Sequence, residues 1–183
     1  MDCQNGIVSV YTKPEGGFIE RASKVLNAVR DAGMTVIHVQ VGFRPGLPEV
    51  SDRNKFFGAI KTSKPHQEFF QGSSGAIHSA LGPKPDDIVV IKSRISAFTG
   101  TDLEMILRAK DIDTVVLLGI STSGVVLSTL LQASDADYRV VVVEDCCTDL
   151  DLELHSALVG RLFPQRSEVI TAEDFVTAVQ NLR

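Results

Sequence analysis

The chain has 183 residues, 44% of them hydrophobic and 22% charged, which is the size and composition of one ordinary globular domain. Its formal net charge of −5 argues against a general nucleic-acid binder, because phosphate recognition needs a concentrated Lys/Arg surface. No apolar run approaches the roughly 18 residues that a bilayer span requires, and no signal peptide is recognisable. We therefore expect a single domain over residues 1–183, located in the cytoplasm, with no nucleic-acid or membrane partner.

Short β-branched runs alternate with longer amphipathic patterns along the chain. The clearest strands are DTVVLLGI at 113–120 and YRVVVVE at 138–144. In chain order, the predicted elements are a helix over 18–32, strands over 35–41 and 87–92, a helix over 101–109, a strand over 113–120, a helix from about 122, a strand over 138–144, a helix around 152–162, a short strand over 168–171 and a helix over 172–182.

Continuous Val/Ile/Leu strands separated by amphipathic helices are typical of a parallel sheet that is covered on both faces. We therefore predict a three-layer α/β/α fold with a doubly wound, mostly parallel, Rossmann-like sheet. Ligands in such folds gather beyond the carboxyl ends of the strands, which selects Lys92 and the segments 119–125 and 144–149.

The stretch from 42 to 85 differs from the rest of the chain. It is rich in Gly, Pro and Ser, and two Phe-Phe pairs interrupt its polar sequence. We interpret it as a long loop that serves as a lid, a binding loop or an oligomer contact.

Three segments carry a further pattern. They are DCQNG at 2–6, IKSRISAF at 91–98 followed by TDL at 101–103, and GISTSGVVLST at 119–129. Their order and spacing resemble the isochorismatase-like hydrolases, the superfamily that includes nicotinamidases and carbamoylsarcosine amidases, over nearly the whole chain. The family commonly forms dimers or larger assemblies, so the resemblance implies a homo-oligomer.

The resemblance also implies a set of catalytic positions. The family's first segment supplies an aspartate, the second a lysine, and the third a nucleophilic cysteine in the first turn of a helix; these positions match Asp2, Lys92 and Val125. A thiolate there would be stabilised by the helix dipole and the lysine, and the aspartate would carry its proton. A valine cannot act as a nucleophile, so we do not expect amide hydrolysis through a thioester.

The family's oxyanion site consists of backbone N–H groups at the strand-to-helix turn. Matching the segments places it at Ile120, Ser121 and Thr122, with a cis peptide bond near Ile120 and Ser121. These groups can orient a substrate even without a thiol nucleophile.

Three side chains complete the candidate substrate site. Arg44, just beyond the strand at 35–41, can contact an anionic substrate or lie on the surface, and Phe98 can wall the pocket or serve packing. Gln4 can contact substrate or fix the loop after Asp2 by hydrogen bonds.

A metal site is not expected. Nicotinamidases hold a metal through an Asp/His cluster after the second strand, but residues 42–48 contain no Asp-x-His pattern, and the four histidines are scattered. We predict neither a metal nor a cofactor.

One branch of the superfamily works without a cysteine. Isochorismatases proper cleave a vinyl ether, and the resemblance implies that Asp2 protonates the enol-ether carbon, giving an oxocarbenium ion that water captures. This role requires burial to raise the pKa of Asp2, while Lys92 binds a substrate carboxylate or organises the water. Val125 then lines the pocket. We predict a hydrolase acting on a small, carboxylated molecule.

Two alternatives stay open. A catalytically inactive binding or oligomer-forming domain would have kept the fold and lost the chemistry. A cysteine amidase could instead use Cys146 or Cys147, which follow the strand at 138–144, although neither matches the family position and buried structural thiols are common.

The N-terminus conflicts with the family pattern. Asp2 would end a central first strand, but only Met1 precedes it in the sequence. We expect this strand to be absent or formed by residues after Asp2, and its absence would leave neighbouring strands without backbone partners. A free amino terminus beside Asp2 would also favour the ionised carboxylate.

Overall fold

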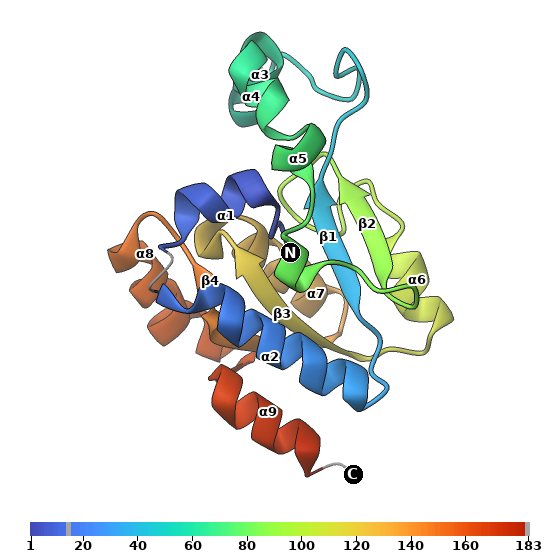
Figure 1. Ribbon diagram of the computed structural model, residues 1–183, viewed down its shortest axis with the longest axis vertical. Coiled ribbons are helices and arrows are strands. Elements are labelled where there is room, and N and C mark those ends of the chain that lie inside the picture. The colour runs from blue at the N-terminus through green and yellow to red at the C-terminus, as the bar shows by residue number, and fades with distance from the viewer. Residues whose placement is uncertain (14–15, 182–183) are drawn as a thin grey trace.

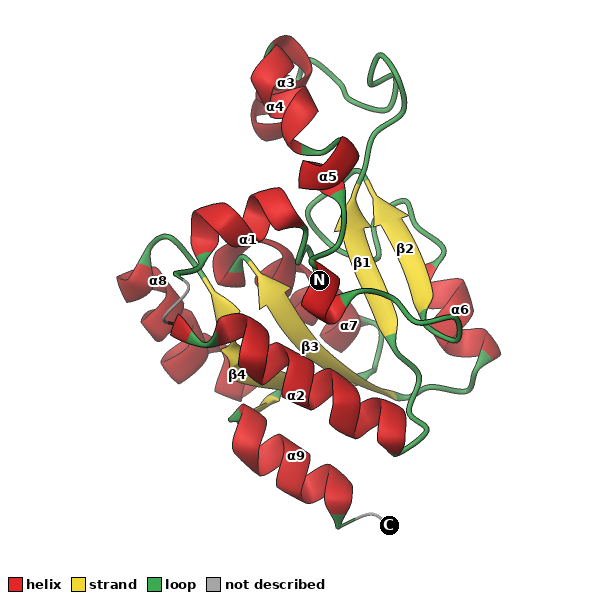
Figure 2. Ribbon diagram, viewed as in Figure 1, coloured by secondary structure: helices red, strands yellow, loops and turns green. Residues whose placement is uncertain are grey.

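The computed structural model describes residues 1–13 and 16–181, and its strands form two parallel sheets that lie side by side between two layers of helices (Figure 1). The strands are β1 (Ile37–Val41), β2 (Ile88–Lys92), β3 (Thr114–Ile120), β4 (Arg139–Thr148) and β5 (Glu168–Ile170). Strand β1 pairs in parallel with β2, and β3, β4 and β5 pair in parallel in that order (Figure 2).

Helices bury apolar stripes against both faces of the sheet. Those on one face are α1 (Asn5–Tyr11), α2 (Phe18–Asp31) and α9 (Ala172–Gln180), and those on the other are α6 (Leu103–Ala109), α7 (Leu127–Asp135) and the turn Leu158–Leu162 after α8 (Leu152–Ala157). Each face has its own apolar cluster, so the sheet is covered on both sides, as a parallel sheet requires. The predicted three-layer α/β fold is confirmed.

The predicted strands and helices occur, with shifted ends. Strand β4 continues four residues beyond the predicted end at 144, through the buried Cys146 and Cys147. Within this continuation, the carboxylate of Asp145 accepts the backbone N–H of Ala172 at 2.7 Å. The last predicted helix ends at Gln180 in the structure, and its predicted final residue 182 lies outside the described residues.

The stretch after β1 is not the long loop that its composition suggests. It forms three short helices, α3 (Lys55–Thr62), α4 (Lys64–Phe69) and α5 (Gly72–Gly75), beyond the carboxyl ends of β1 and β2 (Figure 1). Its aromatic residues are a small core, in which Phe43 and Phe70 pack around the cluster of Leu47, Val50, Phe57 and Ile60. A hydrophobic cluster therefore orders this segment despite its many Gly, Pro and Ser residues.

The first three residues lie between β1 and β3. The N–H of Asp2 donates to the carbonyl of Val39 at 2.8 Å, while the amino group of Met1 donates to the carbonyl of Leu118 at 2.8 Å. The N–H of Ile120 completes the contact by donating to the carbonyl of Met1 at 3.1 Å. From Asn5 onward the chain forms helix α1, so no described residue supplies the expected strand between β1 and β3.

Gly119 permits this close approach of the N-terminus to β3. Its φ of +143° is rarely adopted by other residues, and a Cβ placed there would lie 2.1 Å from the Met1 carbonyl oxygen.

None of the helices in the described part of the chain combines the length and apolar character that a bilayer crossing requires.

We expect Gly119→Ala to lower the free energy of unfolding by about 2 kcal/mol or more, because it combines backbone strain with a clash. Gly160→Ala is the matched control, since a Cβ at Gly160 meets nothing within 4 Å. Denaturant unfolding of both variants measures the difference, and equal stability would contradict the close contact between Met1 and β3.

Candidate active site

Asp2 and Lys92 form a buried ion pair at the carboxyl ends of the strands. Lys92 is the last residue of β2, and Asp2 is held beside the end of β1 by its bond to Val39. The Lys92 Nζ lies 2.8 Å from Asp2 Oδ2 and also donates to the carbonyl of Arg94 at 3.0 Å. The two side chains are only 2% and 7% exposed, so this pair is shielded from water.

Burial and neighbouring charges act in opposite directions on the pKa of the Asp2 carboxyl. Burial raises its pKa, and the charge and hydrogen bond of Lys92, together with the amino terminus, oppose this rise only in part. Its second oxygen, Oδ1, is buried and has no hydrogen-bond partner among the described residues. The site therefore combines a carboxyl of raised pKa with a buried oxygen that has no hydrogen-bond partner among the described residues.

The turn after β3 places further polar groups near the same end of the sheet. Its peptide bond between Ile120 and Ser121 is cis, as the family resemblance implies. The Ile120 N–H is engaged by the Met1 carbonyl, and the N–H groups of Gly124 and Val126 donate to the Ser121 carbonyl at 3.2 Å each. The Ile120 amide is therefore not free to bind an oxyanion, which leaves Ser121 and Thr122 as the candidates in this turn.

Two side-chain contacts in this region were not predicted from the sequence. The hydroxyl of the fully buried Thr122 lies 2.8 Å from Nδ1 of His155, which had been regarded as one of several scattered histidines. Ser123 donates to Asp149 Oδ2 from its N–H at 2.8 Å and from its hydroxyl at 2.7 Å. Burial alone would raise the pKa of Asp149, but these hydrogen bonds lower it, so Asp149 is an ionised group that fixes the turn. Asp149 did lie within the segment selected by the strand-end rule.

Val125 lies in the helical turn Thr122–Val126 that leads from β3 into α7. Its side chain is buried in the apolar cluster that also contains Val126 and Leu130. The first turn after β3 therefore carries a buried aliphatic side chain at Val125.

The cysteines are poorly suited to replace that thiol. Cys3, Cys146 and Cys147 are all free and buried. Burial raises the pKa of Cys146 and of Cys147 to about 12 and also raises that of Cys3, so their reactive thiolate forms are suppressed at neutral pH.

Among the described residues, no hydrogen bond or salt bridge joins the remaining predicted site residues, Gln4, Phe98 and Arg44, to Asp2 or Lys92. Both N–H donors of the Gln4 amide bind backbone carbonyls, those of Val41 at 3.0 Å and Gly75 at 2.8 Å, so Gln4 fixes the chain next to β1. Phe98 packs against Tyr138 with ring centroids 6.0 Å apart. The Arg44 side chain is 76% exposed, with a guanidinium nitrogen 3.9 Å from Glu49.

Within residues 1–13 and 16–181, no group of three or more His, Cys, Asp or Glu side chains is placed to hold a metal ion. The chemistry available at this end of the sheet is that of a buried carboxyl, an ammonium group and backbone amides.

Comparisons with known proteins agree on one family. The isochorismatase domain matches residues 1–174 of the chain. Maleamate amidohydrolase of Pseudomonas putida is 30% identical over 90% of this chain and 74% of its own length. The uncharacterised isochorismatase family protein YecD of Escherichia coli is 31% identical over 98% of this chain and 93% of its own length.

Solved structures give the same result. An isochorismatase family protein from Burkholderia thailandensis superimposes with a TM-score of 0.86 at 31% identity, covering 98% of this chain and 92% of that protein. N-carbamoylsarcosine amidase from Thermoplasma acidophilum superimposes with a TM-score of 0.73 at 27% identity, covering 94% and 93% of the two chains. The chain belongs to the isochorismatase family of hydrolases.

Proposed function

We propose that this hydrolase acts on a small carboxylated molecule and that Asp2 donates a proton directly to the substrate. The observation that carries the proposal is the Asp2 carboxyl itself. It is buried, its pKa is raised, one oxygen is held by Lys92 and the other has no partner among the described residues. A general acid needs a retained proton and an oxygen that no other group of the protein already binds.

Lys92 serves a second purpose in this proposal. Its ammonium group has three donors, and two of them are directed at Asp2 and at the Arg94 carbonyl. The third can bind a substrate carboxylate or the attacking water. The same positive charge limits how far the pKa of Asp2 can rise, which keeps the carboxyl able to release its proton.

A vinyl ether is the substrate type that fits these groups. Asp2 adds its proton to the enol-ether carbon, and the ether oxygen stabilises the resulting oxocarbenium ion. Water then adds to this ion and the carbon–oxygen bond of the ether breaks, releasing an alcohol and a ketone. No covalent bond to the protein is formed, so Val125 at the family's nucleophile position is no obstacle.

Amide hydrolysis is the chemistry of the named relatives, among them maleamate amidohydrolase and the ureidoacrylate amidohydrolases. For this chain we rank amide hydrolysis below vinyl-ether cleavage, because its nucleophilic step needs a thiolate. Val125 provides none, and the three thiols present have raised pKa values.

A non-catalytic binding or oligomer-forming domain is the remaining alternative. The buried aliphatic side chain of Val125 favours it. Assembly into a homo-oligomer stays a prediction under either function.

Asp2→Asn should reduce pyruvate release from isochorismate at least ~100-fold, because general acid catalysis contributes a factor of that size and an amide cannot supply the proton. The control is Asp87→Asn, which removes another buried, ion-paired carboxylate, beside Arg30, away from the site. If the parent releases pyruvate and Asp2→Asn releases it equally fast, Asp2 is not the acid.

The pH dependence should follow the protonated form of Asp2. Because burial raises this pKa above the ordinary value of 3.8, the acid is present below its raised pKa and is lost as the pH rises through it. We therefore expect the rate of pyruvate release to fall with increasing pH along one limb. A rate that instead increases as Asp2 ionises would indicate a base and contradict the proposed step.

Val125→Cys should create amidase activity toward maleamate or ureidoacrylate, because it places a thiol in the helical turn after β3, at the position that the family resemblance gives to the nucleophile. Ammonia release measures the gain, and Val125→Ala is the control that opens the same space without a thiol. Absence of any gain in the folded variant would argue that Val125 does not occupy the nucleophile position.

A further inference from the structure

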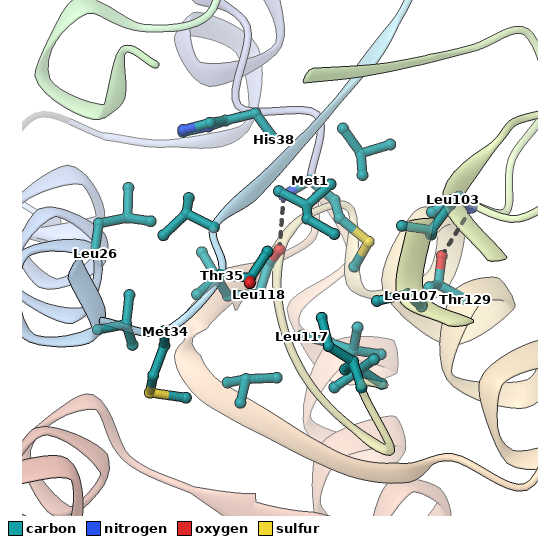
Figure 3. A pocket seen from close by; sticks show the side chains of 18 of the residues that line it. Met1, Leu26, Met34, Thr35, His38, Leu103, Leu107, Leu117, Leu118 and Thr129 are labelled. Atoms are coloured by element: carbon teal, nitrogen blue, oxygen red, sulfur yellow. Dashed lines mark hydrogen bonds between the residues drawn. The ribbon is translucent and has the colours of Figure 1, made fainter. Parts of the chain in front are cut away.

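Large apolar side chains are exposed on two helices that follow the carboxyl ends of strands. Phe56 of α3 is 62% exposed and Leu152 of α8 is 68% exposed, and the nearby Leu150 and Leu154 are also exposed. None of these four side chains lines the apolar cavity of about 420 Å³ between β1 and β3 (Figure 3). Their exposure therefore does not belong to a pocket for a small molecule, and apolar groups gathered on a surface indicate contact with another macromolecule.

The charges around these apolar residues have opposite signs on the two helices. Residues 53–56, RNKF, contain two basic residues and no acidic one, and residues 150–154, LDLEL, contain two acidic residues and no basic one. We call these segments the basic patch and the acidic patch. Their four charged side chains are exposed and form no salt bridge among the described residues, whereas Lys61 and Lys64 farther along the chain have acidic partners. Both patches therefore have charge that is available to a partner.

Helix α1 lies between the two patches (Figure 1). At its start, the side chain of Asn5 donates to the carbonyl of Ser73 in α5 at 2.8 Å, and α5 belongs to the same folded segment as α3. At its end, Tyr11 lies near Asp149, because burial and the Asp149 carboxylate together raise the pKa of the Tyr11 hydroxyl. In α1 itself, Val10 is 50% exposed. This surface thus has a basic end, an apolar residue in its middle and an acidic end.

We propose that this surface binds a second copy of the chain in a two-fold dimer, in which the basic patch of each copy contacts the acidic patch of the other. A surface with opposite charges at its two ends is complementary to itself after a two-fold rotation, because the rotation exchanges the ends. Phe56 of each copy then packs against the exposed leucines of the other, and the charged side chains surround this apolar contact. Val10 lies near the two-fold axis.

Partners of other chemistry match only one of the two patches. A nucleic acid or an anionic membrane is attracted to the basic patch and repelled by the acidic patch, and a basic peptide is in the reverse situation. A second copy carries both charges in the required arrangement. The contact involves neither Asp2 nor Lys92, so its test is independent of the catalytic proposal.

The test uses two single charge reversals, Lys55→Glu in the basic patch and Glu153→Lys in the acidic patch. Sedimentation velocity over a range of concentrations measures association. We expect the parent chain to be a dimer and each variant alone to have a dissociation constant at least about 10-fold higher, because like charges then face each other. An equimolar mixture of the two variants should dimerise like the parent, since both contacts of the mixed dimer again join opposite charges.

Two matched controls make the same charge changes at exposed positions away from the patches. Lys24→Glu lies on α2, and Glu173→Lys lies in the first turn of α9, as Glu153 does in α8. Neither control should change the dissociation constant. Recovery of the dimer on mixing would also show that both patch variants are folded.

A parent chain that stays monomeric at high micromolar concentration would overturn the proposal, as would patch variants that dissociate no more readily than the controls. A chain that carries both reversals distinguishes contact within one copy. If that chain dimerises like the parent while the mixture of single variants does not, the two patches meet within the same chain and the two-fold contact is wrong. Assemblies that keep growing with concentration would contradict it too, because a two-fold contact closes at two copies.

Discussion

The buried pair of Asp2 and Lys92 depends on where the first three residues of the chain lie. Lys92 is fixed by its position at the end of β2, whereas Asp2 is fixed by backbone bonds between the N-terminal segment and the flanking strands β1 and β3. Gly119 makes room for that segment. The backbone hydrogen bonds of Met1 and Asp2 therefore both place the Asp2 carboxyl beside Lys92 and connect β1 with β3.

Burial raises the pKa of both the Asp2 carboxyl and the cysteine thiols, but the consequences for catalysis are opposite. It raises the pKa of Asp2, whose Oδ1 has no hydrogen-bond partner among the described residues, and this favours the proposed acid role. It also holds protons on Cys146 and Cys147, where the thiolate and not the thiol would be the nucleophile. One physical effect thus supports acid catalysis at Asp2 and opposes thiol catalysis elsewhere.

Much of the fold follows from sequence patterns, because long β-branched runs such as that of β3 have few alternatives to a buried parallel strand. The pairing of Asp2 with Lys92 could be anticipated from strand ends and family motifs. The contact between Thr122 and His155 could not, since it joins positions 33 residues apart through tertiary packing alone. The helices α3 to α5 were missed because a small aromatic core outweighs their polar composition. How the N-terminus fits between β1 and β3 depends on Gly119, whose role no local pattern reveals.

The protonation state of Asp2 is the central claim, and a carboxyl ¹³C NMR titration of the folded chain measures it directly, with Asp2→Asn to assign the signal. The account predicts that the Asp2 carboxyl titrates above its ordinary pKa of 3.8 despite the neighbouring Lys92 ammonium. A carboxyl that stays ionised to below that value would contradict it, because Lys92 would then dominate over burial and Asp2 would have no proton to donate.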